Sequence, residues 1–403
     1  MSPMTTDRSS TRRPRVLVVQ PSINPPGGGN AVACWMIEAL RTSYHVTLLT
    51  REAPDLEYAN RVFGTSLTAD DLDIVVAPLA AARLMAFVRP VATLALLRDH
   101  LLLARARRMA VDCDVVVTAH NESDLGRRGI QYVHFPKLVT ARPDAGLRWY
   151  QGPVAVGVYQ AACALMTGFR SGRMRRNITL VNSDWTGRLV RARHGIEPVT
   201  LYPPAAGPFP QVPWSDRRLA FVCVGRIAQE KRIEAVIGIV ARVRRHHPGI
   251  TLHIAGNADD RSYLARIQAA VRTQGDWVSL DLDLPRDRLL HLMASCRFGI
   301  HGMRDEHFGM AVAELLCAGV IPFAHHSGGP VEILDGDRRL LYESDDDAVD
   351  RISRVLADEA LIEALRDSTA ARAGHLSRES FVHRFQGIVA GLAAERDGAH
   401  RGW

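Results

Sequence analysis

Residues 219–232 read LAFVCVGRIAQEKR, an apolar run that ends in glycine and is followed at once by charged residues. Its β-branched and aromatic side chains favour a strand, and the residues after it favour a helix. A strand, a tight turn and a helix in this order form the repeating unit of a parallel sheet covered by helices. The carboxyl ends of such strands carry the ligand site, so Arg226 and Lys231 are the first candidate binding residues.

The same alternation of strand-like and helical patterns runs through both halves of the 403-residue chain. A chain of this length is expected to form two domains of about 200 residues each. The predicted strands are 15–20, 45–50, 72–77, 114–118, 129–134 and 178–182 in the first half, and 219–224, 251–255, 277–281, 298–302, 320–324 and 339–342 in the second. The fold class is therefore α/β, with two Rossmann-like, doubly wound parallel sheets that face a cleft.

Domain boundaries follow from composition. Residues 1–13 are polar and are expected to be a disordered tail, and residues 203–216 contain five prolines and are expected to be a linker. The two domains are then 14–202 and 217–379, and 380–403 holds a last helix and a tail.

The location predicted from the sequence is cytoplasmic. The amino terminus has no apolar stretch of the kind found in signal peptides, and the six cysteines never form a CxxC pair, which is typical of buried thiols in a reducing compartment. Residues 153–169 are uncharged but shorter than about 20 residues, so we predict a buried helix and no membrane span.

Positive charge is concentrated in the first half, where residues 1–200 hold 25 Lys and Arg against 16 Asp and Glu. Two segments are richest in arginine, 83–108 and 170–176. Apolar residues interleaved with arginines suit an anionic membrane surface or a phosphorylated acceptor, and the alternative is an ordinary solvated helix face. Both interpretations stay open at this point, and under the first the protein would be peripheral on the cytoplasmic membrane face. We predict no nucleic-acid partner.

Two short motifs have the chemistry of a phosphate site. Gly27, Gly28 and Gly29 lie between the first strand and a helix, where glycine allows close backbone approach and the helix start offers free amides. Arg226 and Lys231 follow the first strand of the second domain, where two cations could neutralise a diphosphate leaving group. A tight turn and an ordinary helix start are the alternatives.

The most specific motif is EHFGMAVAELLCAG, residues 306–319. Glu306 precedes a helix whose first amides, at Phe308, Gly309 and Met310, can hold an anion. Glu314 lies inside an apolar helix, where a buried carboxylate needs partners; ribose hydroxyls would provide them, and an arginine elsewhere in the domain is the alternative.

Other candidates have weaker signals. His134 ends a strand of the first domain and could hydrogen-bond the transferred sugar, although a structural role is common for such a histidine. Residues 281–283 and 345–347 resemble acidic metal motifs, but we interpret them as a strand end and a helix start and predict no metal. Two carboxylates also suit a glycosidase, but the cation pair favours a phosphorylated donor.

Together these residues resemble family 4 retaining glycosyltransferases of the GT-B type over nearly the whole chain. Within that family the chain is most similar to the α-1,2-mannosyltransferases that extend the dolichol-linked oligosaccharide from GDP-mannose. The stretches that carry the resemblance are YVHFP (132–136), VNSDWT (181–186), LYPP (201–204), EHFG (306–309) and AHHSGGP (324–330). The chain departs from the eukaryotic enzymes in lacking their amino-terminal anchor and in residues 137–176.

The resemblance implies a role for each motif. Arg226 and Lys231 would bind the donor diphosphate, Glu306 the sugar, Glu314 the ribose, and His134 the sugar beside the reacting carbon. Gly28 and Gly29 would contact the phosphate from the acceptor-side domain, and the last helix would return to that domain.

The resemblance also implies a metal-independent front-face reaction with no cofactor besides the nucleotide sugar. GDP-mannose is favoured as donor and a UDP-sugar is the alternative, while the acceptor is a glycan, a lipid-linked sugar or a small molecule. Three other functions stay open: a nucleotide-sugar epimerase, a glycosyl phosphorylase, and a non-catalytic transferase-like subunit.

Overall fold

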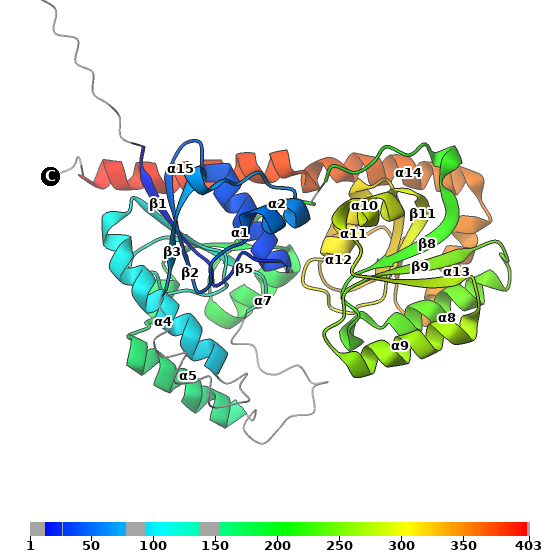
Figure 1. Cartoon of the computed structure of the whole chain (residues 1–403), viewed down its shortest axis with the longest axis horizontal. Coiled ribbons are helices and arrows are strands. Elements are labelled where there is room, and N and C mark those ends of the chain that lie inside the picture. Colours follow the sequence, from blue (N-terminus) through cyan, green and yellow to red (C-terminus); the bar gives the residue numbers. More distant parts are fainter. Residues whose placement is uncertain (1–12, 26, 78–93, 137–152, 206, 401–403) are drawn as a thin grey trace, which may run out of the picture.

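The protein forms two α/β domains that lie side by side, as the computed structural model shows (Figure 1). The structure describes residues 13–25, 27–77, 94–136, 153–205 and 207–400. The predicted disordered tail, 1–13, falls almost entirely outside these ranges. Because each domain has its own parallel sheet, the predicted fold class is confirmed.

The amino-terminal sheet has seven parallel strands in the order β3-β2-β1-β4-β5-β6-β7. The strands are β1 (Arg15–Val19), β2 (His45–Thr50), β3 (Leu72–Val76), β4 (Val115–Thr118), β5 (Ile130–Val133), β6 (Ile178–Val181) and β7 (Val199–Thr200). Strand order reverses between β1 and β4, which is the position where doubly wound sheets bind ligands.

Helices cover both faces of this sheet. They are α1 (Gly28–Leu40), α2 (Leu56–Phe63), α4 (Leu94–Met109), α5 (Pro153–Thr167), α6 (Ser171–Met174) and α7 (Asp184–His194). One apolar core lies between the sheet and α1, and a second lies between the sheet and α4. The alternate side chains of β1 enter different cores, as expected of a strand buried on both faces: Val16 and Val18 face α1, whereas Leu17 and Val19 face α4.

The carboxyl-terminal sheet has six parallel strands in the order β10-β9-β8-β11-β12-β13, so its order reverses between β8 and β11. The strands are β8 (Arg218–Val224), β9 (Thr251–Gly256), β10 (Val278–Leu282), β11 (Cys296–His301), β12 (Ile321–His325) and β13 (Leu341–Tyr342). The helices are α8 (Ile233–Arg244), α9 (Arg261–Gln274), α10 (Arg286–Ala294), α11 (Met310–Cys317), α12 (Pro330–Ile333), α13 (Asp345–Leu356) and α14 (Glu359–Ala373).

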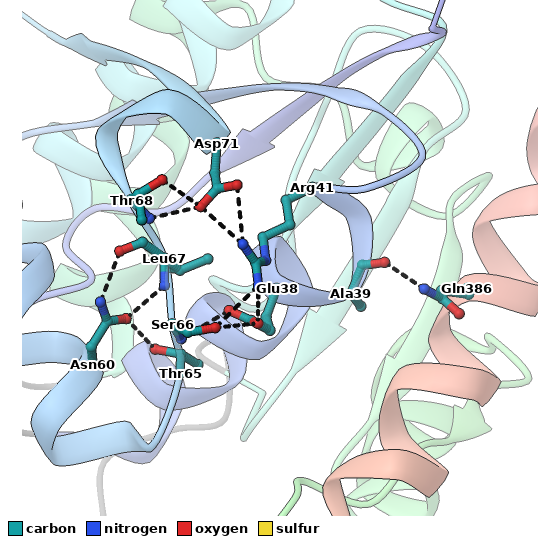
Figure 2. A network of polar contacts seen from close by, with 10 residues as sticks. All are labelled: Glu38, Ala39, Arg41, Asn60, Thr65, Ser66, Leu67, Thr68, Asp71 and Gln386. Carbon is teal, nitrogen blue, oxygen red and sulfur yellow. Dashed lines mark hydrogen bonds and ion pairs between the residues drawn. The ribbon is translucent and has the colours of Figure 1, made fainter.

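The last helix, α15 (Arg378–His400), runs back from the carboxyl-terminal domain and lies along α1 (Figure 1). Phe381, Phe385 and Val389 are buried in the same core as α1. Figure 2 shows the polar part of this contact, in which the Gln386 side chain donates to the Ala39 carbonyl at 2.7 Å. Beside it, Arg41 joins the end of α1 to the helical turn just before β3 by pairing with Asp71 at 3.1 Å.

The predicted strands are all present, with ends that differ by at most two residues, and the short edge strand β7 was not predicted. The prediction of a buried helix at 153–169 is wrong. Helix α5 lies at the surface, with Val158, Leu165 and Met166 exposed by 66%, 86% and 65%. An uncharged sequence indicated burial, but in the part of the chain that the structure describes one face of this helix, which carries these three side chains, is exposed while Cys163 on the helix is buried. None of the described helices is long and apolar enough to cross a bilayer.

Candidate active site

The candidate residues lie in loops at the points where the two sheets reverse their strand order. Gly27, Gly28 and Gly29 follow β1, whereas Arg226 and Lys231 follow β8. In both sheets the carboxyl ends of the central strands therefore point toward the other domain's loops. An added Cβ at Gly28 would lie 3.5 Å from the Met310 side chain, so the two domains touch at this edge.

A charge cluster forms the centre of the site. The Glu306 carboxylate pairs with Lys231 and accepts a hydrogen bond from His301 Nε2 at 3.2 Å through the same oxygen. Burial alone would raise the pKa of Glu306, but the hydrogen bond from His301 and the charge of Lys231 lower it well below its usual value. Glu306 is therefore ionised throughout the physiological range and holds a fixed negative charge beside two donors.

Arg226 lines the same small cavity as Lys231, His301 and the glycines that end β8 and β11. Its guanidinium pairs with Glu230 at 2.8 Å and is half exposed. A surface pair of this kind contributes only about 0–1 kcal/mol, so Arg226 can exchange Glu230 for a phosphate at little cost. The sequence motif predicted Arg226 and Lys231 as binding residues, and the structure shows that each pairs with a carboxylate.

The loop before α11 is shaped by Gly309. This residue has a φ of 104°, which other residues rarely adopt, and α11 begins immediately after it at Met310. The side chain of Phe308 is buried in the domain core and stacks on Tyr202 with ring centres 5.8 Å apart. Of the three predicted anion-binding positions, Phe308 therefore offers only its backbone to a ligand.

Glu314 has the alternative partner that the sequence left open. Arg286, at the start of α10, donates to its carboxylate at 2.6 Å, and both side chains are largely buried. Arg286 had no sequence signal that marked it as a partner. The ion pair satisfies one oxygen of the carboxylate. If Glu314 also binds ribose, the ribose hydroxyls and Arg286 bind the same carboxylate.

His134 lies beside the glycine turn. An added Cβ at Gly29 would come within 3.2 Å of His134 Nε2, so a larger residue there would press on the imidazole. The same nitrogen donates to the Ala119 carbonyl at 2.9 Å, because a carbonyl can only accept. Asn121 holds the end of this strand by accepting from the His134 amide at 2.7 Å.

The structure thus brings the predicted residues into two groups, Gly28, Gly29 and His134 on one domain and Arg226, Lys231 and Glu306 on the other. His301 was missed, although the argument that singled out His134, a histidine at the end of a strand, applies to it equally. Among the described residues, no group of three or more His, Cys, Asp or Glu side chains is arranged to hold a metal ion.

This fold and this arrangement of loops define a two-domain transferase architecture of the GT-B type. Residues 209–373, which form most of the carboxyl-terminal domain, match the family described as "Glycosyl transferases group 1". The resemblance inferred from the motifs is confirmed at this level.

Two of the similar proteins share one name. The chain is 29% identical over 227 residues to a GDP-Man:Man(3)GlcNAc(2)-PP-Dol alpha-1,2-mannosyltransferase of Yarrowia lipolytica, a match that covers 49% of this chain and 35% of that protein. The human protein of the same name is 28% identical over 237 residues, covering 53% and 48%. The match thus spans half or less of these relatives' length.

Solved structures agree on the fold. WaaG, a glycosyltransferase involved in lipopolysaccharide biosynthesis, superposes with a TM-score of 0.67 at 15% identity, covering 93% of this chain and 100% of WaaG. Sucrose-phosphate synthase from Thermosynechococcus elongatus gives a TM-score of 0.69 at 16% identity, with coverage of 95% and 100%. At this identity the likeness extends to the fold alone.

Proposed function

We propose that this protein is a family 4, retaining, metal-independent glycosyltransferase that moves mannose from GDP-mannose to a lipid-linked glycan. The observation that carries the proposal is the cluster of Lys231, Glu306 and His301 at the end of β11, with Arg226 in the same cavity. The names of the curated relatives support mannose, GDP and a lipid-linked acceptor.

The reaction that fits these residues is a front-face displacement. The acceptor hydroxyl attacks the anomeric carbon on the side from which the nucleotide diphosphate leaves. The new carbon–oxygen bond forms as the bond to the diphosphate oxygen breaks, and the hydroxyl proton passes to that oxygen. Lys231 and Arg226 stabilise the charge that grows on the diphosphate, while Glu306 orients the sugar hydroxyls.

The different roles proposed for Lys231 and Arg226 follow from their ion pairs. Lys231 is held by a buried partner and is a fixed cation, whereas Arg226 has an exposed partner and can swing onto the phosphates. The amides at the start of α11 add a helix dipole that favours the same anion.

A thermal-shift panel tests the donor. Binding to the folded state raises the unfolding temperature, so GDP and GDP-mannose should raise it more than UDP, ADP and their sugars at equal concentration. HepE from Anabaena, solved with UDP and glucose, has a similar fold with a TM-score of 0.66, and UDP-sugars are accordingly the second donor class in the panel. A larger shift with UDP would overturn the assignment of GDP.

Product analysis separates the alternative functions. A transferase releases nucleotide in step with a new glycosidic product, and only when an acceptor is present. An epimerase interconverts the donor sugars, a phosphorylase consumes inorganic phosphate, and a non-catalytic subunit leaves the donor intact. Retention of the α configuration in the product, read by NMR, tests the stereochemistry, and full activity in the presence of EDTA tests metal independence.

The acceptor side is proposed to lie between α4 and α5. A cavity of about 330 Å³, within the size range of ligand pockets, opens there among apolar residues and the paired side chains of Asp99 and His120, which are 2.9 Å apart. His120 and Glu122, which line this cavity, follow β4, the strand next to β5, and His134 follows β5. A cavity lined by both polar and apolar side chains suits an amphiphilic acceptor.

The surface around this cavity supports peripheral binding to an anionic membrane. Helix α5 carries the exposed apolar residues, and α4 packs against it. Exposed arginines lie on α4 and on the segment after α5: Arg98, Arg105, Arg108, Arg170, Arg175 and Arg176. Arg83 and Arg89, also predicted to contribute, lie outside the described residues. Apolar side chains beside cations bind the interface of anionic lipids.

A further inference from the structure

A polar contact across the two domains is not explained by the donor site itself. Helix α7 of the amino-terminal domain faces the short helix α12 of the other domain. The Glu332 carboxylate accepts from the Asp184 amide at 2.7 Å with one oxygen and from the Trp185 amide at 2.6 Å with the other. Amides at the start of a helix have no partner within the helix, and the helix dipole favours a carboxylate there. Glu332 therefore caps α7 from the opposite domain.

A second contact reaches residues 306–309, the loop before α11 that carries Glu306 and is called the donor loop below. Ser183, fully buried, donates from its hydroxyl to the His307 carbonyl at 2.6 Å. The His307 ring stacks on Phe135 with ring centres 4.0 Å apart and an angle of 12° between the planes. His307 is the neighbour of Glu306, so the amino-terminal domain holds the backbone next to the charge cluster.

Within the carboxyl-terminal domain, the turn before α12 and the donor loop form one rigid unit. The Gly329 amide donates to the Glu306 carbonyl at 2.8 Å. An added Cβ at Gly328 would lie 2.2 Å from that same carbonyl oxygen, and one at Gly329 would lie 2.4 Å from the Phe308 carbonyl oxygen. No side chain fits here, so the turn that precedes Glu332 is packed directly against the backbone of Glu306 and Phe308.

We infer that Glu332 is a positioning residue that couples closure of the two domains to the placement of Glu306. The inference rests on the proposed transferase function. When the domains separate, Glu332 loses both α7 amides and His307 loses Ser183; when they close, these contacts press the donor loop into one position. Glu332 itself does not line the cavity that holds Arg226 and Lys231.

The test is Glu332→Gln, which keeps the size of the side chain but turns an amide N–H toward a backbone N–H. The loss of hydrogen bonds to a charged group is expected to lower kcat/KM about tenfold to hundredfold. The charged residues proposed to hold GDP, Arg226 and Lys231, both belong to the carboxyl-terminal domain, so the Kd of GDP should change less than kcat/KM and stay within about twofold of the wild type. Small-angle X-ray scattering with GDP should give a larger radius of gyration for the variant than for the wild type.

Three further variants sharpen the test. Glu363→Gln on the exposed face of α14 is the matched control and should change neither measurement. Glu332→Asp keeps the charge but is one methylene shorter, so it should recover part of the lost activity. Ser183→Ala removes the other contact to the donor loop and should also lower kcat/KM, which keeps the test available if Glu332→Gln does not fold.

Two results would overturn the inference: wild-type kcat/KM in Glu332→Gln, or a radius of gyration equal to that of the wild type. A failure of the proposed function has a different signature. In that case the wild-type protein turns over no donor, yet the scattering difference between wild type and Glu332→Gln persists.

Discussion

The proposed donor side and the proposed acceptor side of this protein differ in how their side chains are held. In the carboxyl-terminal domain Lys231 and Glu306 come from short loops, hold one another in an ion pair and are largely buried. In the amino-terminal domain the proposed acceptor region is a cavity beside an uncharged helix whose apolar side chains face outward. A charged ligand requires charged side chains at fixed positions, and these residues form a recognisable sequence motif. An apolar ligand requires only apolar surface, which many sequences can provide, so the proposed acceptor region has no such motif.

The largest effect should come from removing the fixed cation. Lys231→Ala is expected to lower kcat by about 10²–10³, as for the loss of one preorganised donor to a developing anion. Steady-state turnover of donor with acceptor measures it. Arg245→Ala, an exposed arginine at the end of α8, is the control and should retain full turnover. Near-normal turnover in Lys231→Ala would remove the basis for a donor site at this position.

Acid should weaken the donor side through Glu306. Its folded pKa is lowered, so the ion pair contributes stability above the unfolded pKa near 4.5, and that contribution is lost as the pH falls below it. At pH 7 Glu306→Gln should lower the free energy of unfolding by about 1–3 kcal/mol, and the difference from wild type should shrink below pH 4.5. Denaturant unfolding at several pH values measures this. Glu57→Gln, on the surface of α2, should show no such trend, and a pH-independent difference for Glu306→Gln would contradict the ion-pair account.

On the acceptor side, the exposed face of α5 should respond to charge. Leu165→Glu or Met166→Glu is expected to weaken binding to vesicles of phosphatidylglycerol about tenfold, since a buried leucine-sized side chain contributes about 1.5–3 kcal/mol. Vesicle co-sedimentation measures it. Val111→Glu is the matched control, because Val111 is also an exposed apolar residue of this domain, at 75%. Equal loss in all three variants would point to net charge alone, and no loss to a different membrane face or none.

The smallest expected effect distinguishes two uses of one carboxylate. If Glu314 binds ribose as well as Arg286, GDP should bind severalfold more tightly than its 2′,3′-dideoxy analogue, and Glu314→Gln should reduce that preference. If Glu314 serves only Arg286, the variant should weaken both ligands equally. Isothermal titration of the four combinations measures the difference, and Glu363→Gln serves as its control.

Much of the fold could be predicted from the sequence because its signals are local. Strands such as β1 and β4 are short runs made mostly of valine and leucine, and a charged residue marks the start of each, Arg15 for β1 and Asp114 for β4. The donor motifs could be located for the same reason, since Arg226, Lys231 and Glu306 directly follow predicted strands or precede a predicted helix. Helix α5 shows the limit of this reasoning. Its apolar composition was correctly recognised, but composition does not reveal whether another element covers the helix.

By itself, the sequence determined the two-sheet architecture, the ends of the strands and the residue types that gather there, because these depend on neighbours a few positions apart. Only the tertiary structure decided which charged side chains and backbone amides form pairs. Glu332 meets the α7 amides across 148 positions of sequence, and Lys231 meets Glu306 across 75. The first contact depends on how the two domains pack, and the second depends on how distant loops of one domain come together, so no short-range pattern encodes either.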